Sequence, residues 1–397
     1  MTIEVRVPEE ADWLPLVEVD GRAFASPWTP ERLAVVRPSI DLSRFRIACD
    51  GPELVGLAGS FAFDVTLPGG SCVPAGGLTW VAVSASHRRQ GILRSLITAV
   101  HNDMHDRGEP LALLRASEGS IYERFGYGIA HHESEITLDV HAATLRPEFV
   151  VAPGSVRYLV GEAALDHIVQ IWEASRRCSA GELSRSPVWH RMMFENRAAA
   201  TGNASSAFHL AHTGGFVSYR VEQDWNFGLP RHKLIIVDFA AITVEAHVAL
   251  WNMLLSIDLI GTITSSILPI DDPLRYMLTN ARALRTTDLS DGMWALPFDV
   301  RTCFGARTYG TSDRLVVEVD GKRWAIDGSP DGGDVTPVRS KPDLVTRTSA
   351  LGPLLFGGVR AAQLAAGGQL QARSDDALRR ADRFFLGDRL SASSTFF

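Results

Sequence analysis

The residues with the clearest chemical pattern form a short turn between an apolar strand and a helix. Arg88, Arg89, Gln90 and Gly91 follow the apolar residues 81–83. A helix N-terminus favours an anion because its first backbone N–H groups are unpaired and its dipole is positive there, and arginine adds paired donors. The turn therefore predicts a phosphate or pyrophosphate site, although it has neither P-loop nor GxGxxG spacing. The alternative is an ordinary strand–turn–helix segment with solvated arginines.

This turn resembles the acyl-CoA-binding loop of the GCN5-related N-acetyltransferases, the GNAT superfamily, whose pattern is Arg/Gln-x-x-Gly-x-Gly/Ala. Arg88 and Gly91 match, whereas Leu93 stands where the pattern has a small residue. The resemblance implies acetyl transfer from acetyl-CoA to an amine. That reaction needs a held donor, a polarised carbonyl, a neutral amine and a proton for the thiolate. Backbone N–H groups of the strand Val81–Val83 can polarise the carbonyl if a bulge frees them.

Tyr122 is the predicted proton donor. A phenol with a pKa of about 10 can protonate a thiolate, whose acid has a pKa of about 8.5, in a slightly uphill step. The run from Tyr122 to Tyr127 also resembles the GNAT element Tyr-x-x-x-Gly-Phe/Tyr, whose first tyrosine faces the cofactor sulfur. Tyr127 is then the structural aromatic, and a packing role for Tyr122 is the alternative. No carboxylate near it, Glu118 and Glu123 included, is singled out as a base.

Composition describes a globular protein with no nucleic-acid-binding character. Of 397 residues, 46% are hydrophobic and 21% are charged, and the net charge of −7 lacks the basic excess that a nucleic-acid binder needs. The negative net charge is compatible with cationic substrates. The length allows two or three domains.

The cysteines and the termini point to a reducing compartment. The four cysteines are scattered and form no zinc or redox motif, so we expect buried free thiols at Cys49, Cys72, Cys178 and Cys303. The acidic N-terminus is no signal peptide, and no apolar run approaches the ~20 residues of a membrane span. We therefore expect a cytoplasmic protein without a metal.

Hydrophobic patterning predicts an α/β (α+β) first region with a mixed sheet and packed helices. Ile92, Leu93, Leu96, Ile97 and Val100 form a helical stripe, and Gly108 is expected to end that helix. The expected strands cover 44–49, 53–65, 75–84 and Pro110–Ala116.

A second region, roughly 155–290, repeats the order strand–helix–strand. Strands are expected near 215–222 and 231–239, a helix at Val244–Ser256 and a strand at Ile260–Leu268. Its turn, residues 238–243, has no glycine and no arginine, so we predict a degenerate copy without the cofactor site. A coincidental α/β domain is the alternative.

The pattern changes from Asp291 onward. A hairpin is expected around Asp320-Gly321, joining strands 315–319 and 323–326. Helices are expected at 349–366 and 374–385, separated by a short strand.

Together these features resemble the enhanced intracellular survival (Eis) N-acetyltransferase family, a bacterial branch of the GNAT proteins. The resemblance covers essentially the whole chain, and the family's leucine at the position of Leu93 removes the one mismatch. The segments that carry it are HRRQGILRSL, SEGSIYERFGYG, Tyr219-Arg220, ALWNMLLSIDLI, Asp271-Asp272-Pro273-Leu274, DGMWALPFDV and Ala306-Arg307-Thr308-Tyr309.

The resemblance implies a homohexamer of three-region chains. The regions are an acetyltransferase domain (1–150), a degenerate acetyltransferase-like domain (151–290) and a sterol-carrier-protein-like domain (291–397). It assigns the general acid to Tyr122 and the base to the terminal carboxylate of Phe397. The implied CoA contacts are Val81, Ala82, Val83, Arg89, Gln90, Gly91, Ile92, Leu93, Arg94, Ser117 and Glu118. The implied substrate-pocket aromatics are Phe24, Trp28 and Trp80.

A terminal carboxylate is an intrinsically poor base, because a free α-carboxyl group has a pKa of about 3.5. Desolvation by Phe396 and Phe397 would raise that pKa. The carboxylate could instead take the proton through a water molecule, or only orient the cationic amine. A further alternative is that the two phenylalanines are an apolar tail docked on a core, with no catalytic role.

The acceptor is less defined than the donor. Ser26, Pro27 and Phe396 near the aromatic positions are not acidic, and Glu31 and Asp64 have no assigned place, so we expect a smaller or more aromatic amine than an aminoglycoside. Two other functions stay open. They are lipid binding by the C-terminal region beside a vestigial acetyltransferase, and acetylation of protein lysines.

Overall fold

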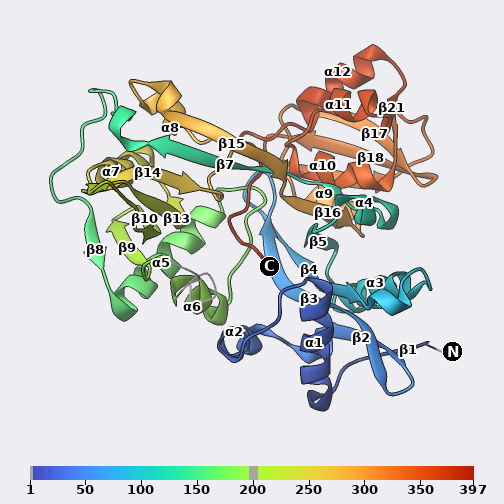
Figure 1. Ribbon diagram of the computed structural model, residues 1–397. Helices are drawn as coiled ribbons and strands as arrows, with labels where there is room; N and C mark the ends of the chain where they lie inside the picture. Colours follow the sequence, from blue (N-terminus) through green and yellow to red (C-terminus); the bar gives the residue numbers. More distant parts are fainter. Residues whose placement is uncertain (1–2, 196–203) are drawn as a thin grey trace. The chain divides into compact units, whose positions relative to one another are not determined.

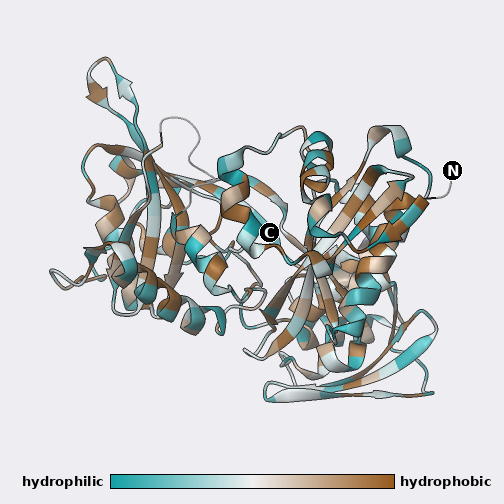
Figure 2. Ribbon diagram, turned by 90° about the horizontal axis from the view of Figure 1, so that it is seen from below, coloured by the Kyte–Doolittle hydropathy of each residue, from teal (hydrophilic) through white to brown (hydrophobic). Residues whose placement is uncertain are grey.

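The chain divides into two compact units, each built from separate stretches of sequence. The computed structural model describes residues 3–195 and 204–397 (Figure 1). Unit 1 contains Met1–Ala130, Met293–Asp388 and Phe396–Phe397, and unit 2 contains His131–Gly292 and Arg389–Thr395. Many strands carry hydrophobic residues along their length, whereas other strands and many helical turns and loops are hydrophilic (Figure 2). The division into three sequence regions at residues 150 and 290 stays a prediction.

A seven-stranded sheet forms the first half of unit 1. Its spatial order is β1 (Ile3–Arg6), β2 (Phe45–Asp50), β3 (Glu53–Thr66), β4 (Cys72–Val83), β5 (Leu111–Arg115), β16 (Met293–Pro297) and β6 (Gly128–Ile129). All neighbours are antiparallel except β4 and β5, which are parallel and joined by helix α3 (Ile92–Asp106). Helices α1 (Trp13–Ala23), α2 (Pro30–Val36) and α4 (Gly119–Tyr122) complete this part.

Helix α3 covers one face of this sheet with the apolar stripe expected from the sequence. Ile92, Leu96, Ile97 and Val100 are all buried there, together with Met104, whereas Leu93 of the expected stripe is only partly buried. Burying a side chain of this size contributes about 1.5–3 kcal/mol. The stripe therefore holds the helix N-terminus, and the turn before it, at a fixed place beside the carboxyl end of β4.

Unit 2 contains a second seven-stranded sheet with the same parallel strand–helix–strand unit. Its order is β15 (Leu284–Asp291), β7 (His132–Asp139), β14 (Ile260–Ser265), β13 (His232–Ala241), β10 (Gly215–Glu222), β9 (Phe208–His212) and β8 (Arg157–Leu159). Strands β13 and β14 are parallel and are joined by α7 (Val244–Leu255). The other elements of this unit are α5 (Gly161–Arg176), α6 (Pro187–Glu195), α8 (Leu274–Met277) and the short pair β11 (Trp225–Asn226) and β12 (Leu229–Pro230).

The C-terminal part of unit 1 is a five-stranded sheet with helices. The sheet order is β19 (Gly332–Pro337), β18 (Lys322–Ser329), β17 (Asp313–Val319), β20 (Leu344–Thr346) and β21 (Leu370–Ala372). The helices are α9 (Val300–Gly305), α10 (Leu351–Phe356), α11 (Ala361–Ala366) and α12 (Asp375–Phe384).

A buried arginine ties two of these helices together. Arg307 is completely buried, and its guanidinium donates hydrogen bonds to the carbonyl oxygens of Leu355 and Phe385, at 2.8 Å each. These oxygens lie at the C-terminal ends of α10 and α12, where carbonyl groups have no partner within the helix. Burial lowers the pKa of Arg307 to about 10. The guanidinium therefore satisfies carbonyl groups that a buried helix end would leave unpaired.

The expected mixed sheets with packed helices are confirmed, with two corrections. The helix expected at 349–366 is two helices, because Gly357 ends α10 with a left-handed φ of +69°. The expected hairpin is present and joins β17 and β18, with positive φ at both Asp320 and Gly321.

The second correction concerns the cysteines. All four are free, but Cys72 and Cys178 are exposed, so the expectation that all four are buried is wrong for these two.

Candidate active site

The parallel strands β4 and β5 stop pairing where β4 has a bulge. Their ladder ends at the pair Leu78–Leu114, and two residues farther along β4, Trp80 and Val81, together face the single residue Ala58 of β3. Trp80 has a φ of +51°, a conformation that few non-glycine residues adopt. A bulge leaves its extra residue outside the ladder, so backbone N–H groups can point to a ligand. This is the bulge on which the sequence interpretation depended.

The N-terminus of α3 is open at the same edge of the sheet. Gly91, its N-cap residue, has a φ of +83° and supplies no side-chain cap, and Arg89 has a φ of +62°. Unpaired N–H groups at a helix start suit an anion. Arg88, Arg89 and Gln90 are exposed around it. The pattern read from the sequence is thus an exposed turn with two arginines, at a helix start that no side chain caps.

The predicted CoA contacts divide into a buried and an exposed set. Ala82 and Ile92 are buried, and Val81, Val83 and Leu93 are partly buried against the same hydrophobic cluster. The side chains of Ala82 and Ile92 are therefore withdrawn from a ligand, whereas those of Val81, Val83 and Leu93 stay partly accessible. The exposed set is Arg89, Gln90, Gly91, Arg94, Ser117 and Glu118.

Tyr122 ends the short helix α4, just after β5. It is 8% exposed, and its ring meets that of Tyr127 edge-on, with centroids 6.1 Å apart. Burial, with a smaller effect from the carboxylate of Glu118, raises the pKa of Tyr122 to about 12. Tyr122 therefore holds its proton more firmly than the ordinary phenol for which the slightly uphill transfer was expected.

Tyr127 anchors this tyrosine pair in the core. It is fully buried, and its hydroxyl lies 2.8 Å from Nε2 of His101 on α3. Burial lowers the pKa of His101 to about 4, so the imidazole is neutral at pH 7. A neutral imidazole paired with a phenol gives Tyr127 a fixed place and, through ring contact, limits the positions that Tyr122 can take.

The C-terminal residue packs against β4 through a glycine. The ring of Phe397 lies 5.0 Å from that of Phe63, and a Cβ at Gly77 would come within 2.8 Å of Phe397 Cε2 and 2.6 Å of Phe63. Gly77 is thus the residue that lets the chain end approach this strand. Phe396 is 72% exposed, with the guanidinium of Arg115 over its ring at 5.2 Å.

Two of the three predicted pocket aromatics stack on each other. The rings of Trp28 and Trp80 are 4.9 Å apart and nearly parallel, at 12°. Phe24, which follows α1, is 46% exposed. Arg32 lies over the ring of Trp28 at 4.8 Å, so one ring face already attracts a cation.

Sequence reasoning missed the acidic residue of this cluster. Asp20 on α1 is only 5% exposed and accepts a hydrogen bond from Nε1 of Trp28 at 2.8 Å. Burial raises the pKa of Asp20, and the bond from Trp28 opposes that effect. Trp13 and Phe45 also contact the ring of Trp80, each at 6.0 Å. The available signal was the spacing of Trp13 and Asp20, seven residues apart on one helix.

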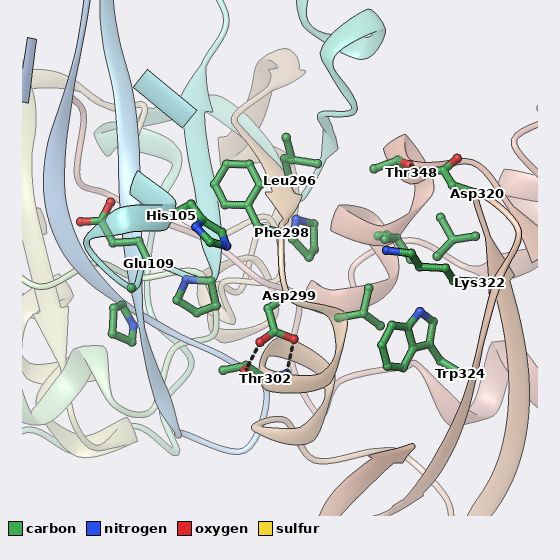
Figure 3. A pocket seen from close by; sticks show the side chains of 17 residues that line it. His105, Glu109, Leu296, Phe298, Asp299, Thr302, Asp320, Lys322, Trp324 and Thr348 are labelled. Carbon is green, nitrogen blue, oxygen red and sulfur yellow. Dashed lines mark hydrogen bonds between the residues drawn. The ribbon is translucent and has the colours of Figure 1, made fainter. Parts of the chain in front are cut away.

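A cavity of about 690 Å³ in unit 1 is lined by other residues (Figure 3). Phe298 and Trp324 line it together with His105, Asp320 and Lys322, and none of the predicted site residues does so. In the figure, Asp299 is bonded to Thr302, whose backbone N–H and hydroxyl it accepts at 3.0 and 2.7 Å. The lining thus combines charged and apolar side chains.

In residues 3–195 and 204–397, no cluster of three or more potential metal ligands is present. Nor does any helix in these described ranges have the length and apolar character to cross a membrane.

Comparison with known families identifies all three parts of the chain. Residues 4–130 and residues 181–301 each match an Acetyltransferase (GNAT) domain family. Residues 300–391 match the Sterol carrier protein domain family. The tandem acetyltransferase fold and the C-terminal sterol-carrier-like region expected from the sequence are thereby confirmed.

Full-length relatives agree with this assignment. The chain is 32% identical to the N-acetyltransferase Eis of Mycobacterium tuberculosis over 403 residues, 98% of each protein, and 32% identical to an uncharacterized N-acetyltransferase of Streptomyces avermitilis over 97% of each. The crystal structure of Eis1 from Mycobacterium abscessus superimposes with a TM-score of 0.88 at 30% identity, covering 99% of this chain and 100% of that one. A GCN5-related N-acetyltransferase from Anabaena variabilis shares the fold, with a TM-score of 0.83 at 18% identity over the whole of both chains. The chain therefore belongs to the Eis family of GNAT N-acetyltransferases.

Proposed function

We propose that this N-acetyltransferase transfers the acetyl group of acetyl-CoA directly to the amine of a small acceptor. The observation that carries the proposal is the bulge at Trp80 and Val81, placed where β4 and β5 separate and beside the open N-terminus of α3. A thioester lying in this gap has backbone donors for its carbonyl oxygen and a positively charged turn for its phosphates.

The donor would be held mainly by main-chain groups. Gly91 and the first turn of α3 offer N–H groups to the pyrophosphate, and Arg89 and Arg94 add positive charge. Ser117 and Glu118 lie in the loop after β5 and border the same gap. Because the side chain of Ile92 is buried, a substitution there would change acetyl-CoA binding by shifting the backbone of the turn.

In the proposed step the amine nitrogen attacks the thioester carbonyl carbon. The new C–N bond forms as the C–S bond breaks, and the sulfur leaves with its electron pair. Tyr122 gives its phenolic proton to that thiolate and regains one from solvent. With the pKa of Tyr122 at about 12 and that of a thiol in water at about 8.5, the proton transfer is uphill by about 5 kcal/mol. The transfer must therefore occur together with C–S cleavage, in a site whose low polarity also disfavours the thiolate.

The ammonium proton is taken by the terminal carboxylate of Phe397. The exposed ring of Phe396 leaves this end of the chain open to water. Because water can reach the chain end, we favour proton transfer through a water molecule over a carboxylate made more basic by desolvation.

The aromatic cluster supports a small or aromatic amine as the acceptor. Trp28 and Trp80 offer stacked rings, and Asp20 is buried and already bonded to Trp28. Arg32 and Arg37 lie over the rings of Trp28 and Trp13, at 4.8 and 4.9 Å, and would repel a polycation. The homohexamer implied by the family resemblance stays a prediction.

Thiol release from acetyl-CoA, measured across a panel of amines, tests these roles. Tyr122→Phe and deletion of Phe397 should each lower kcat by about 100-fold or more, the usual contribution of general acid–base catalysis, while calorimetric acetyl-CoA affinity is kept. Tyr276→Phe, at an exposed tyrosine, is the matched control and should leave kcat unchanged.

Full activity without Phe397 would show that the proposed base is wrong. If kanamycin-type aminoglycosides were the best acceptors, the proposed acceptor class would fail. Faster acetylation of lysine peptides than of any free amine would instead indicate a protein acetyltransferase.

A further inference from the structure

The segment just before the two terminal phenylalanines is fixed in unit 2 by a buried carboxylate. Glu182, in the loop between α5 and α6, is buried. Its Oε1 accepts hydrogen bonds from the hydroxyls of Ser393 and Thr395, both at 2.9 Å. Its Oε2 accepts the backbone N–H of Ser394 at 2.8 Å and the hydroxyl of Ser394 at 3.1 Å. One side chain thus binds three consecutive residues of the tail.

Arg185 of the same loop forms the second part of this anchor. Its guanidinium pairs with both carboxylate oxygens of Asp238, at 2.7 and 3.3 Å, and lies over the ring of Trp172 at 3.3 Å. The remaining donors reach the hydroxyls of Thr395 at 3.1 Å and Ser394 at 3.3 Å. Because Asp238 holds the guanidinium in place, the tail hydroxyls meet a fixed set of donors.

Main-chain bonds continue the anchor toward the start of the tail. The N–H of Leu390 donates to Oδ2 of Asp271 at 3.1 Å, and that of Ala392 to the carbonyl of Ala180 at 2.9 Å. A Cβ at Gly181 would come within 3.0 Å of the backbone of Ala392, so the loop and the tail are in close contact. The tail is therefore held in one register, since a one-residue slip would unpair a buried carboxylate and a buried guanidinium.

We propose that Glu182 and Arg185 are positioning residues that set the place of the C-terminal carboxylate. The proposal rests on the proposed catalytic role of Phe397. Thr395 is fully buried in the anchor, and two extended residues span at most about 7 Å, so a fixed Thr395 restricts the carboxylate to a small volume. Such restriction raises the effective concentration of a catalytic group, and misplacement by about 1 Å can cost 100-fold in rate.

Two isosteric substitutions weaken the anchor from its two sides. Glu182→Gln removes the charge that the tail hydroxyls bind, and Thr395→Val removes one hydroxyl of the tail without changing Glu182 or Arg185. Each should lower kcat by about 10- to 100-fold, with KM for acetyl-CoA unchanged. Carboxypeptidase should also release phenylalanine from both variants faster than from the wild type. Glu162→Gln, at an exposed glutamate paired with Arg191, is the control and should match the wild type in both assays.

The outcomes separate this proposal from the catalytic one. If deletion of Phe397 abolishes turnover but both anchor variants keep the wild-type kcat, the positioning role is wrong and the proposed base stands. If the deletion leaves turnover intact, the proposed base fails, and with it the reason for the anchor. A third outcome would be that both variants lose melting temperature, acetyl-CoA affinity and kcat together, while carboxypeptidase releases phenylalanine as slowly as from the wild type. The network would then be merely structural, and the proposal would be overturned.

Discussion

At the residue scale, Trp80 links the two halves of the proposed chemistry. Its left-handed backbone, with a φ of +51°, produces the bulge on β4, and its ring stacks on Trp28. A strained backbone of this kind costs about 1–3 kcal/mol and persists where the surroundings over-determine it. Here Trp13 and Phe45 pack on the same ring. The donor-binding strand and the acceptor-side aromatics are thus fixed by one residue.

The pH dependence of turnover tests the protonation state of Tyr122. An ordinary tyrosine would lose half of its protons near pH 10, whereas a pKa raised to about 12 keeps Tyr122 protonated there. With an alkylamine acceptor, kcat/KM should therefore rise between pH 6 and 10, as more amine becomes neutral, and show no fall. A falling limb below pH 10 that disappears in Tyr122→Phe would contradict this.

At the element scale, α3 and α7 occupy equivalent places but begin differently. Strand β13 has a bulge opposite β10, at the junction of Ser218 and Tyr219, as β4 has one opposite β3. Yet the hydroxyl of Thr243 caps α7 by accepting the N–H of Ala246, whereas Gly91 leaves the start of α3 uncapped by a side chain. An N–H already paired within the protein is less available to a phosphate, which supports a degenerate second copy.

Glycines at the two ends of α3 allow a matched test of the anion site. Gly91 and Gly108 both have left-handed φ, +83° and +77°, and open space where a Cβ would stand. Alanine at either position carries a similar backbone strain of about 1 kcal/mol. Gly91→Ala should raise KM for acetyl-CoA by about 5-fold or more through a shifted turn. Gly108→Ala should cost similar stability in thermal unfolding and leave KM unchanged; equal KM values in the two variants would argue against the anion site.

At the scale of the whole molecule, unit 1 depends on a strand that lies far along the chain. Met293–Pro297 forms β16 between β5 and β6, and it pairs with both. The chain leaves this unit after Ala130 and returns at Met293. The first sheet is therefore complete only when the later sequence is present.

A fragment of residues 1–150 should for this reason lack cooperative folding. Without β16, the buried strand β5 has an unpaired edge, and such an edge promotes aggregation. Circular dichroism should show no cooperative thermal transition for this fragment, while the full chain shows one or more. A soluble fragment with a sharp transition would contradict the dependence on β16.

The sequence alone determined features that are encoded within a few residues. These are the glycine turn at Gly91, the stripe of α3 and the hairpin at Asp320 and Gly321. Each depends on local backbone preference or short-range periodicity, which neighbouring side chains set directly. Resemblance to a family supplied the role of Phe397, which no local pattern indicates.

Tertiary structure decided the contacts that join distant parts of the sequence. Only packing shows that Asp20 bonds to Trp28, that Gly77 admits Phe397 and that Glu182 holds the tail. Such contacts depend on which buried polar groups and which volumes must be matched across the whole fold, and a linear pattern carries no record of that match. The sequence therefore determined the turn and helix on which the proposed donor site depends, because these are set by neighbouring residues, and the tertiary structure decided how the aromatic cluster and the chain end pack.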